Sequence, residues 1–244
     1  MSKVWYASSG EWYKEEGEPV FFNPHDSAWA MDIENHWQDI KGEIQDLIKE
    51  RDKEFTSNSY VGLSKGDSWS SYTFLFWQLR ARKERLVDTC PTLAKYLQQV
   101  PGLVSFSLSR LAPHTTIEPH RGDTNAVMRC HLGIEVPAGL PDCGLQAGAE
   151  QQGWSEGKWL FFNDAFKHSA WNNTDKRRIV IIMDVIRPEF LPKQRKICAN
   201  IRTRHFVLQI ENNIQIIKKL KYLLKAPLFS IIYVITYLFH NQSL

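Results

Sequence analysis

The feature that most constrains this chain is the alternation of apolar and polar side chains between residues 104 and 186. Apolar Val104, Phe106 and Leu108 alternate with serines, and this period of two is typical of a strand with one buried face. Turn sequences separate the successive runs, at Pro113, at 137–141 and at 151–157. Many short strands joined by regular turns predict a β-barrel or a β-sandwich.

Two runs within this region carry imidazole and guanidinium groups. Residues 118–133 read Glu-Pro-His-Arg-Gly-Asp-Thr-Asn-Ala-Val-Met-Arg-Cys-His-Leu-Gly, and residues 162–171 read Phe-Asn-Asp-Ala-Phe-Lys-His-Ser-Ala-Trp. Alternation places Arg129 and His131 on one face of their strand. Arg178 begins a strand face that is otherwise mostly apolar, which is an unfavourable place for a charge unless it meets an anion.

These residue types are those of a redox iron site. Two neutral imidazoles, often with one carboxylate, leave coordination positions open for a cosubstrate and oxygen. Arginine suits the far end of a dianionic cosubstrate because it grips a carboxylate with two parallel donors. A single histidine is usually a packing residue. The joint occurrence of His120, His168, Arg129 and Arg178 favours a metal site with an adjacent anion pocket.

The same residues resemble the motifs of the aspartyl/asparaginyl β-hydroxylase family of iron(II)- and 2-oxoglutarate-dependent dioxygenases. The resemblance runs from Val104 to Phe190. It rests on separated motifs in matching order, namely Pro119-His120, Gly122, Thr124-Asn125, Arg129, His131-Leu132-Gly133, Gly157-Lys158, Phe162 to His168, Trp171, Arg178 and Asp184. It implies a mainly β fold with flanking helices, a double-stranded β-helix (cupin-like jelly roll) whose mouth holds the site.

The resemblance also implies the cofactors and the roles of individual residues. Fe(II) would be the metal, held by His120 and His168, and 2-oxoglutarate and O2 would be the cosubstrates. Arg178 would hold the far carboxylate of 2-oxoglutarate. Further hydrogen bonds to this cosubstrate would come from Arg129, His131 and Ser109.

Three nearby positions bear on the ligand set. The carboxylate ligand usual in such oxygenases stands two residues after the first histidine, and here that position is Gly122, as in the best-known members of the family. Asp123 could reach a metal-bound water, and we do not predict it to be a ligand. Asp164 and Asp184 are expected to hold loops through hydrogen bonds.

The predicted activity is therefore hydroxylation of a C–H bond with release of succinate and CO2. The substrate position that we predict first is the β-carbon of an Asp or Asn residue or of an amino-acid derivative. The substrate would then be a small molecule, a peptide or a protein residue. One alternative is lipid acyl-chain hydroxylation at a membrane surface, and another is a non-catalytic, cupin-like protein that binds a metal or a small acid. A zinc hydrolase usually has a third protein ligand and a general base, for which only Asp123 is at hand.

Helical patterns flank the predicted β core. An amphipathic stripe from Trp29 to Leu47 predicts a helix packed on the sheet, residues 71–78 predict a strand, and residues 79–100 predict a helical span. We expect a dioxygenase domain at 1–193, with its β core at about 102–190, and a helical tail at 194–244.

The predicted tail is basic and then apolar. Lysines accompany the helical spacing of residues 206–224, and residues 226–239 carry no charge. That run is shorter than the roughly 20 residues of a membrane-spanning helix. It is compatible with peripheral membrane contact through 206–239, and also with packing on its own domain or on a second copy.

Composition narrows the remaining classes of protein. A net charge of +3 argues against a general nucleic-acid partner. Residues 1–6 lack the apolar core of a signal peptide, so we expect a cytoplasmic protein, membrane-associated if the tail makes that contact. The four cysteines show no paired spacing and are expected to be reduced.

Overall fold

The computed structural model describes residues 3–57, 63–64, 68–81, 85–213 and 222–238. Residues 58–68, which are rich in Ser and Gly and predict a loop, lie largely outside these residues, and the part of the predicted helical spacing at 214–221 lies wholly outside them.

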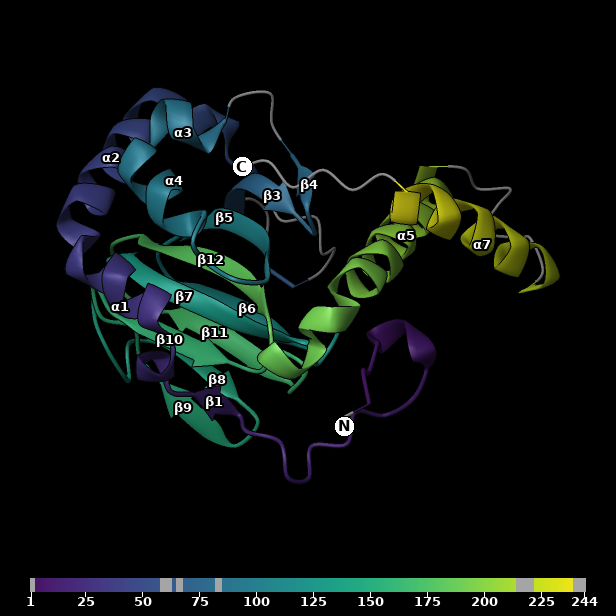
Figure 1. Ribbon diagram of the computed structural model, residues 1–244. Coiled ribbons are helices and arrows are strands. Elements are labelled where there is room, and N and C mark those ends of the chain that lie inside the picture. Colours follow the sequence, from purple (N-terminus) through teal and green to yellow (C-terminus); the bar gives the residue numbers. More distant parts are fainter. Residues whose placement is uncertain (1–2, 58–62, 65–67, 82–84, 214–221, 239–244) are drawn as a thin grey trace.

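Two antiparallel sheets form the body of the molecule (Figure 1). The larger sheet has the order β1 (Phe21–Phe22), β10 (Trp159–Phe162), β7 (Val127–Glu135), β12 (Arg178–Ile186), β5 (Leu103–Leu111), β3 (Trp69–Phe76) and β2 (Thr56–Ser57), and β4 (Leu79–Arg80) pairs with β3. The smaller sheet has the order β6 (Thr115–His120), β11 (His168–Asn172), β8 (Cys143–Ala147) and β9 (Glu150–Gln152). This is a double-stranded β-helix, so the predicted cupin-like jelly roll is confirmed.

The alternating side chains of the larger sheet divide between two cores. Odd-numbered Ile181 and Met183 on β12 pack, with Phe106 of β5, against helices α1 (Ala28–Asn35), α2 (Trp37–Arg51), α3 (Leu86–Thr89) and α4 (Pro91–Leu97). Val180, on the opposite face of β12, packs with Ile117 of the smaller sheet. The face between the two sheets also carries the polar residues of the site described below.

Two helical predictions need correction. The expected helix from Trp29 to Leu47 is two helices, because α1 ends at Asn35 and α2 begins at Trp37, with His36 between them. The expected helical span at 79–100 is wrong at its start, since Trp77 and Gln78 adopt positive φ of 46° and 67° and turn the chain into β4. Pairing with β3 outweighs the local helical pattern there. Sequence patterns also missed β1, β2, β6, β9 and β11.

The C-terminal helices are tied to the β core. After the 3-10 turn η5 (Pro188–Lys193), helix α5 (Gln194–Asn213) places Ile197 and Ile201 against Val104 and Phe190. Helix α7 (Tyr222–Leu238) packs on α5. Among the described residues, no helix combines the length and the apolarity that crossing a membrane requires. The boundary between domain and tail at 193 remains a prediction.

Candidate active site

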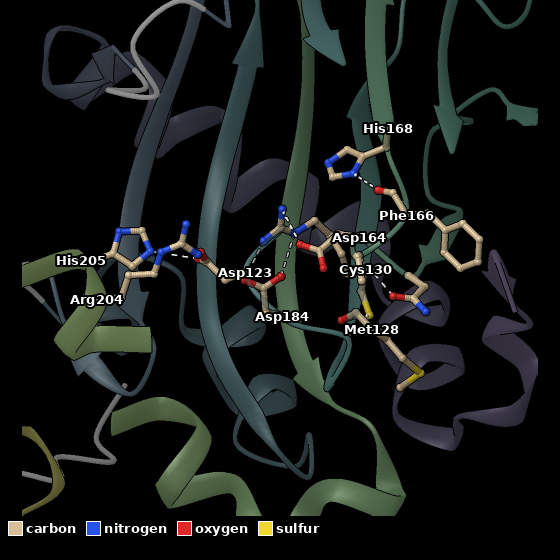
Figure 2. Close-up of polar contacts among 12 residues, drawn as sticks. Asp123, Met128, Cys130, Asp164, Phe166, His168, Asp184, Arg204 and His205 are labelled. Carbon is tan, nitrogen blue, oxygen red and sulfur yellow. Dashed lines mark hydrogen bonds and ion pairs between the residues drawn. The ribbon is translucent and has the colours of Figure 1, made fainter. Parts of the chain in front are cut away.

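Two adjacent strands of the smaller sheet bring His120 and His168 together. The two residues are direct partners in the β6–β11 pairing, and their ring centroids lie 4.2 Å apart. The Nδ1 atom of His120 is 2.8 Å from the Glu118 carbonyl oxygen, and Nδ1 of His168 is 3.0 Å from the Phe166 carbonyl oxygen; Figure 2 shows the second contact. A carbonyl can only accept, so each ring donates through Nδ1 and keeps the lone pair of Nε2 for a metal.

Burial keeps both imidazoles in the form that binds metals. It lowers the pKa of His168 well below its ordinary value, and His120 nearby adds to this effect. Burial also lowers the pKa of His120. Both rings are therefore neutral at pH 7, as ligation requires.

The space beside Gly122, where the usual carboxylate ligand would stand, is occupied by the side chain of Asp164. The Gly122 backbone N–H donates to the Asp164 carbonyl oxygen at 2.7 Å, and a Cβ added to Gly122 would overlap the Asp164 carboxylate. Within the described ranges, no three His, Cys, Asp or Glu side chains are grouped closely enough to hold a metal ion. The protein donors at hand are thus the two imidazoles.

Arg129 holds the side chains of Asp164 and Asp184 together, and Figure 2 shows these two acids side by side. Its Nη1 lies 2.9 Å from Asp164 Oδ2, and its Nε lies 2.8 Å from Asp184 Oδ1. Oδ1 of Asp164 is buried without a hydrogen-bond partner among the described residues, and burial raises the pKa of this carboxyl to about 7.

Sequence patterns suggested only loop-holding roles for these two acids. Arg129 and Asp184 are direct partners in the β7–β12 pairing, so their contact could be predicted once the register of these two strands is known. Nothing in the alternation of residues 162–171 indicated the contact between Asp164 and Arg129.

A small pocket lined by both histidines also contains a buried guanidinium. Arg178 is 1% exposed, and its Nε and Nη1 atoms have no hydrogen-bond partner among the described residues. The guanidinium lies over the Trp154 ring, 4.7 Å from the centroid. Burial lowers the pKa of Arg178 to about 10, so it stays charged at neutral pH. A buried charge of this kind calls for an anion.

The other predicted cosubstrate residues line the same pocket, which includes His120, His168, Ser109, His131, Arg129 and Arg178. Trp154 Nε1 donates to His131 Nδ1 at 3.2 Å. The proton of this ring must therefore sit on Nε2, which is buried and unpartnered in the described structure. Ser109 Oγ accepts from Trp69 Nε1 at 3.2 Å, so its own proton remains available. The pocket thus presents several donors to an anion.

Asp123 is engaged by helix α5. Arg204 Nη1 lies 2.8 Å from one carboxylate oxygen, and His205 Nε2 lies 2.9 Å from the other (Figure 2). No sequence pattern indicated a partner for His205, because Asp123 lies far away in the sequence. The side chain of Asp123 thus helps to fix the loop after His120.

A second cavity of about 180 Å³, here called the groove, opens from His120. Small hydroxyl side chains of β3 and β5 form its floor, and these are Ser71, Thr73, Ser105, Ser107 and Ser109. Aromatic Trp69, Phe76 and Trp77 also line it, together with Asp123. A substrate lying in this groove would reach the histidine pair.

Comparisons with known proteins agree with this geometry. The family model described as aspartyl/asparaginyl beta-hydroxylase matches residues 34–188. The chain is 30% identical to the ornithine lipid ester-linked acyl 2-hydroxylase of Rhizobium tropici over 189 residues, which are 76% of this chain and 66% of that protein. It is 31% identical to the human aspartyl/asparaginyl beta-hydroxylase over 171 residues, which are 67% of this chain and 22% of that protein. This chain therefore spans only part of each relative.

Proposed function

Because the chain belongs to the aspartyl/asparaginyl β-hydroxylase family and is an enzyme of the 2-oxoglutarate-dependent dioxygenase type, we propose that His120 and His168 hold its Fe(II) ion. The observation that carries this proposal is the pair of Nδ1 contacts to backbone carbonyls, which leaves the Nε2 lone pairs of both rings available at paired positions of neighbouring strands. Two imidazoles with room for a bidentate cosubstrate fit a non-haem iron.

The anion pocket would bind 2-oxoglutarate. Arg178 would pair with the far carboxylate, since its guanidinium is buried and has unpartnered donors among the described residues. His131 Nε2–H and the Ser109 hydroxyl would donate to the same molecule. Arg129 lines the pocket, but the carboxylates of Asp164 and Asp184 already hold its guanidinium and offset its charge, so it would orient the site more than attract the anion.

When bound, iron with 2-oxoglutarate and O2 supplies the oxidising power that converts a C–H bond to C–OH and releases succinate and CO2. The chain keeps both histidines neutral through burial and fixes their tautomers through the Glu118 and Phe166 carbonyls. Apolar walls at Trp154 and Phe162 keep water away from the reacting atoms.

For the substrate, we propose a lipid acyl chain, with the β-carbon of an Asp or Asn residue as the alternative. The groove supports the acyl chain. Among its charged residues, Arg121 pairs with Glu15, Asp123 with Arg204, and Arg129 with Asp184. An acidic substrate would have to compete for these cations, whereas the aromatic walls suit an apolar chain. The rhizobial relative is named for an acyl chain and the human relative for Asp and Asn residues.

Succinate formation by the iron-loaded protein tests the reaction. His168→Ala should abolish it and should also abolish the visible absorption band that forms when 2-oxoglutarate binds Fe(II) without oxygen. His25→Ala is the matched control, because His25 is exposed and lies outside the pocket. Full activity of the His168 variant would show that the proposed ligand is wrong.

The substrate is tested by offering an acyl lipid and an Asp-containing peptide in parallel and measuring which gains one oxygen atom by mass spectrometry. Oxygen in the peptide alone would favour the alternative substrate.

A further inference from the structure

Helix α7 presents an apolar face to solvent. Ile231, Val234, Ile235 and Leu238 recur at three- and four-residue steps, so they lie on one side of the helix, and each is between 49% and 66% exposed. An amphipathic helix of a soluble domain normally buries this side. Figure 1 shows α7 on the outer side of α5, away from the sheets.

The opposite side of α7 is anchored to α5 by polar groups. Thr236 Oγ1 lies 2.9 Å from Thr203 Oγ1, and the buried Arg202 donates to the Thr236 carbonyl oxygen. Arg195 Nε donates to the Tyr237 carbonyl oxygen at 3.0 Å, and its guanidinium lies 4.2 Å from the Tyr237 ring centroid. These contacts fix the rotation of α7, and the exposed stripe is a consequence of that rotation.

The sequence that precedes this stripe is basic. Between residues 193 and 225 there are nine Lys or Arg residues and a single acidic residue, Glu211, and two of the nine, Arg202 and Arg204, are engaged by Thr236 and Asp123. Lys193, Arg195 and Lys196 are exposed on the last turn of η5 and the first turn of α5. Residues 226–239 contain no charged side chain. Cations beside an uncharged apolar stripe complement a surface that has negative headgroups and an apolar interior.

We propose that α7 is a docking helix that lies in the interface of an anionic lipid bilayer, with Ile231, Val234, Ile235 and Leu238 inserted among the acyl chains. A helix held along one side by α5 meets the membrane with its other side only, which is the geometry of an in-plane helix. A second copy of the chain fits less well, because a symmetric pairing would bring the same basic segment against itself.

The docking helix is linked to the groove through helix α5. Helix α5 carries α7 and also holds two residues of the groove, since Arg202 donates to the Trp77 carbonyl oxygen at 2.9 Å and Arg204 pairs with Asp123. If the proposed hydroxylase function holds, its substrate is then a lipid of the same bilayer.

Flotation of the full chain with lipid vesicles tests the docking helix without reference to turnover. Wild-type protein should bind vesicles that contain phosphatidylglycerol, bind phosphatidylcholine vesicles more weakly, and lose affinity in about 0.5 M NaCl. Val234→Asp should weaken partitioning at least about tenfold, because one inserted valine side chain is worth roughly 1.5 kcal/mol, which is about a tenfold change in affinity. Val87→Asp on α3 is the matched control, since Val87 is 36% exposed outside the stripe, and its binding should equal that of the wild type.

Three results would overturn the docking helix. They are no binding of wild-type protein to anionic vesicles, equal binding of the Val234 variant, and an equal loss in the Val87 variant. Light scattering, which measures the oligomeric state, tests the alternative that a second copy of the chain binds the stripe. A wild-type dimer that becomes a monomer in the Val234→Asp variant would assign the stripe to that second copy. His168→Ala should float like the wild type, so failure of the iron site and failure of the docking helix give different results.

Discussion

Replacing Arg178 by methionine should change the stability of the protein in opposite directions with and without 2-oxoglutarate. Arg178 is 1% exposed, and no carboxylate pairs with it among the described residues. Two of its nitrogens are buried without hydrogen-bond partners there, and burial lowers its pKa to about 10. In the absence of an anion, this charge opposes folding.

The size of each effect follows from these contacts. Methionine is unbranched and can fill the space over Trp154, so the free energy of unfolding without 2-oxoglutarate should rise by about 1–4 kcal/mol. At a 2-oxoglutarate concentration of 100 times the dissociation constant, the wild type should gain about 2.7 kcal/mol. The variant should gain almost nothing at the same concentration, because the paired donors are gone.

Urea unfolding of metal-loaded, oxygen-free protein, followed by tryptophan fluorescence, measures all four free energies. Arg187→Met is the matched control. Arg187 is also buried, but it pairs at 2.7 Å with Glu18 and with Glu189, so its loss should destabilise the protein by about 1–3 kcal/mol. A clear loss of stability in the Arg178 variant without 2-oxoglutarate, or equal stabilisation of both proteins by 2-oxoglutarate, would refute the anion pocket.

Two further predictions concern packing and pH. Gly122→Ala should lower the free energy of unfolding by about 1–3 kcal/mol, because the new Cβ would overlap the buried Asp164 carboxylate. The control Gly42→Ala, on the exposed face of α2, should raise this free energy by about 1 kcal/mol. Equal urea midpoints for the two variants would contradict this packing. Lowering the pH from 7 to about 5.5 should destabilise the metal-free protein by on the order of 1 kcal/mol per pH unit. Burial lowers the pKa of His131 and His168 well below 6.5, so the unfolded chain binds protons that the folded chain rejects, and stability is lost as the pH falls below 6.5. Asp164, with its pKa raised to about 7, gives a smaller slope of the opposite sign. A urea midpoint that increases as the pH is lowered from 7 to about 5.5 would contradict the assignment of neutral histidines.

The period of two was sufficient to predict the faces of the central strands. Alternation places Arg129 and His131 on one face of β7, and therefore Cys130 and Leu132 on the other. In the structure the first pair lines the pocket, and the second pair packs in the core between the larger sheet and helices α1 to α4. This succeeds because one residue of slip would move every apolar side chain of the strand into the wrong layer.

Contacts between distant elements could not be read in the same way. The polar sequence of β11 shows no strand signal, and only its pairing with β6 places His168 beside His120. The contact between Asp123 and His205 joins a loop to a helix far along the chain. Such contacts depend on where whole elements lie, and no local pattern encodes that.

The close fit between Gly122 and Asp164 limits how such a site can change through single mutations. A site with two histidines and one carboxylate would need an acidic residue at 122. In this chain the space for that side chain holds the Asp164 carboxylate, whose charge Arg129 already balances. An acid gained at 122 would overlap and repel the one at 164. With His120 and His168 as the proposed ligands, the route to a third protein ligand at 122 therefore needs a replacement of Asp164 as well, and a population that explores one mutation at a time meets a barrier between the two kinds of iron site.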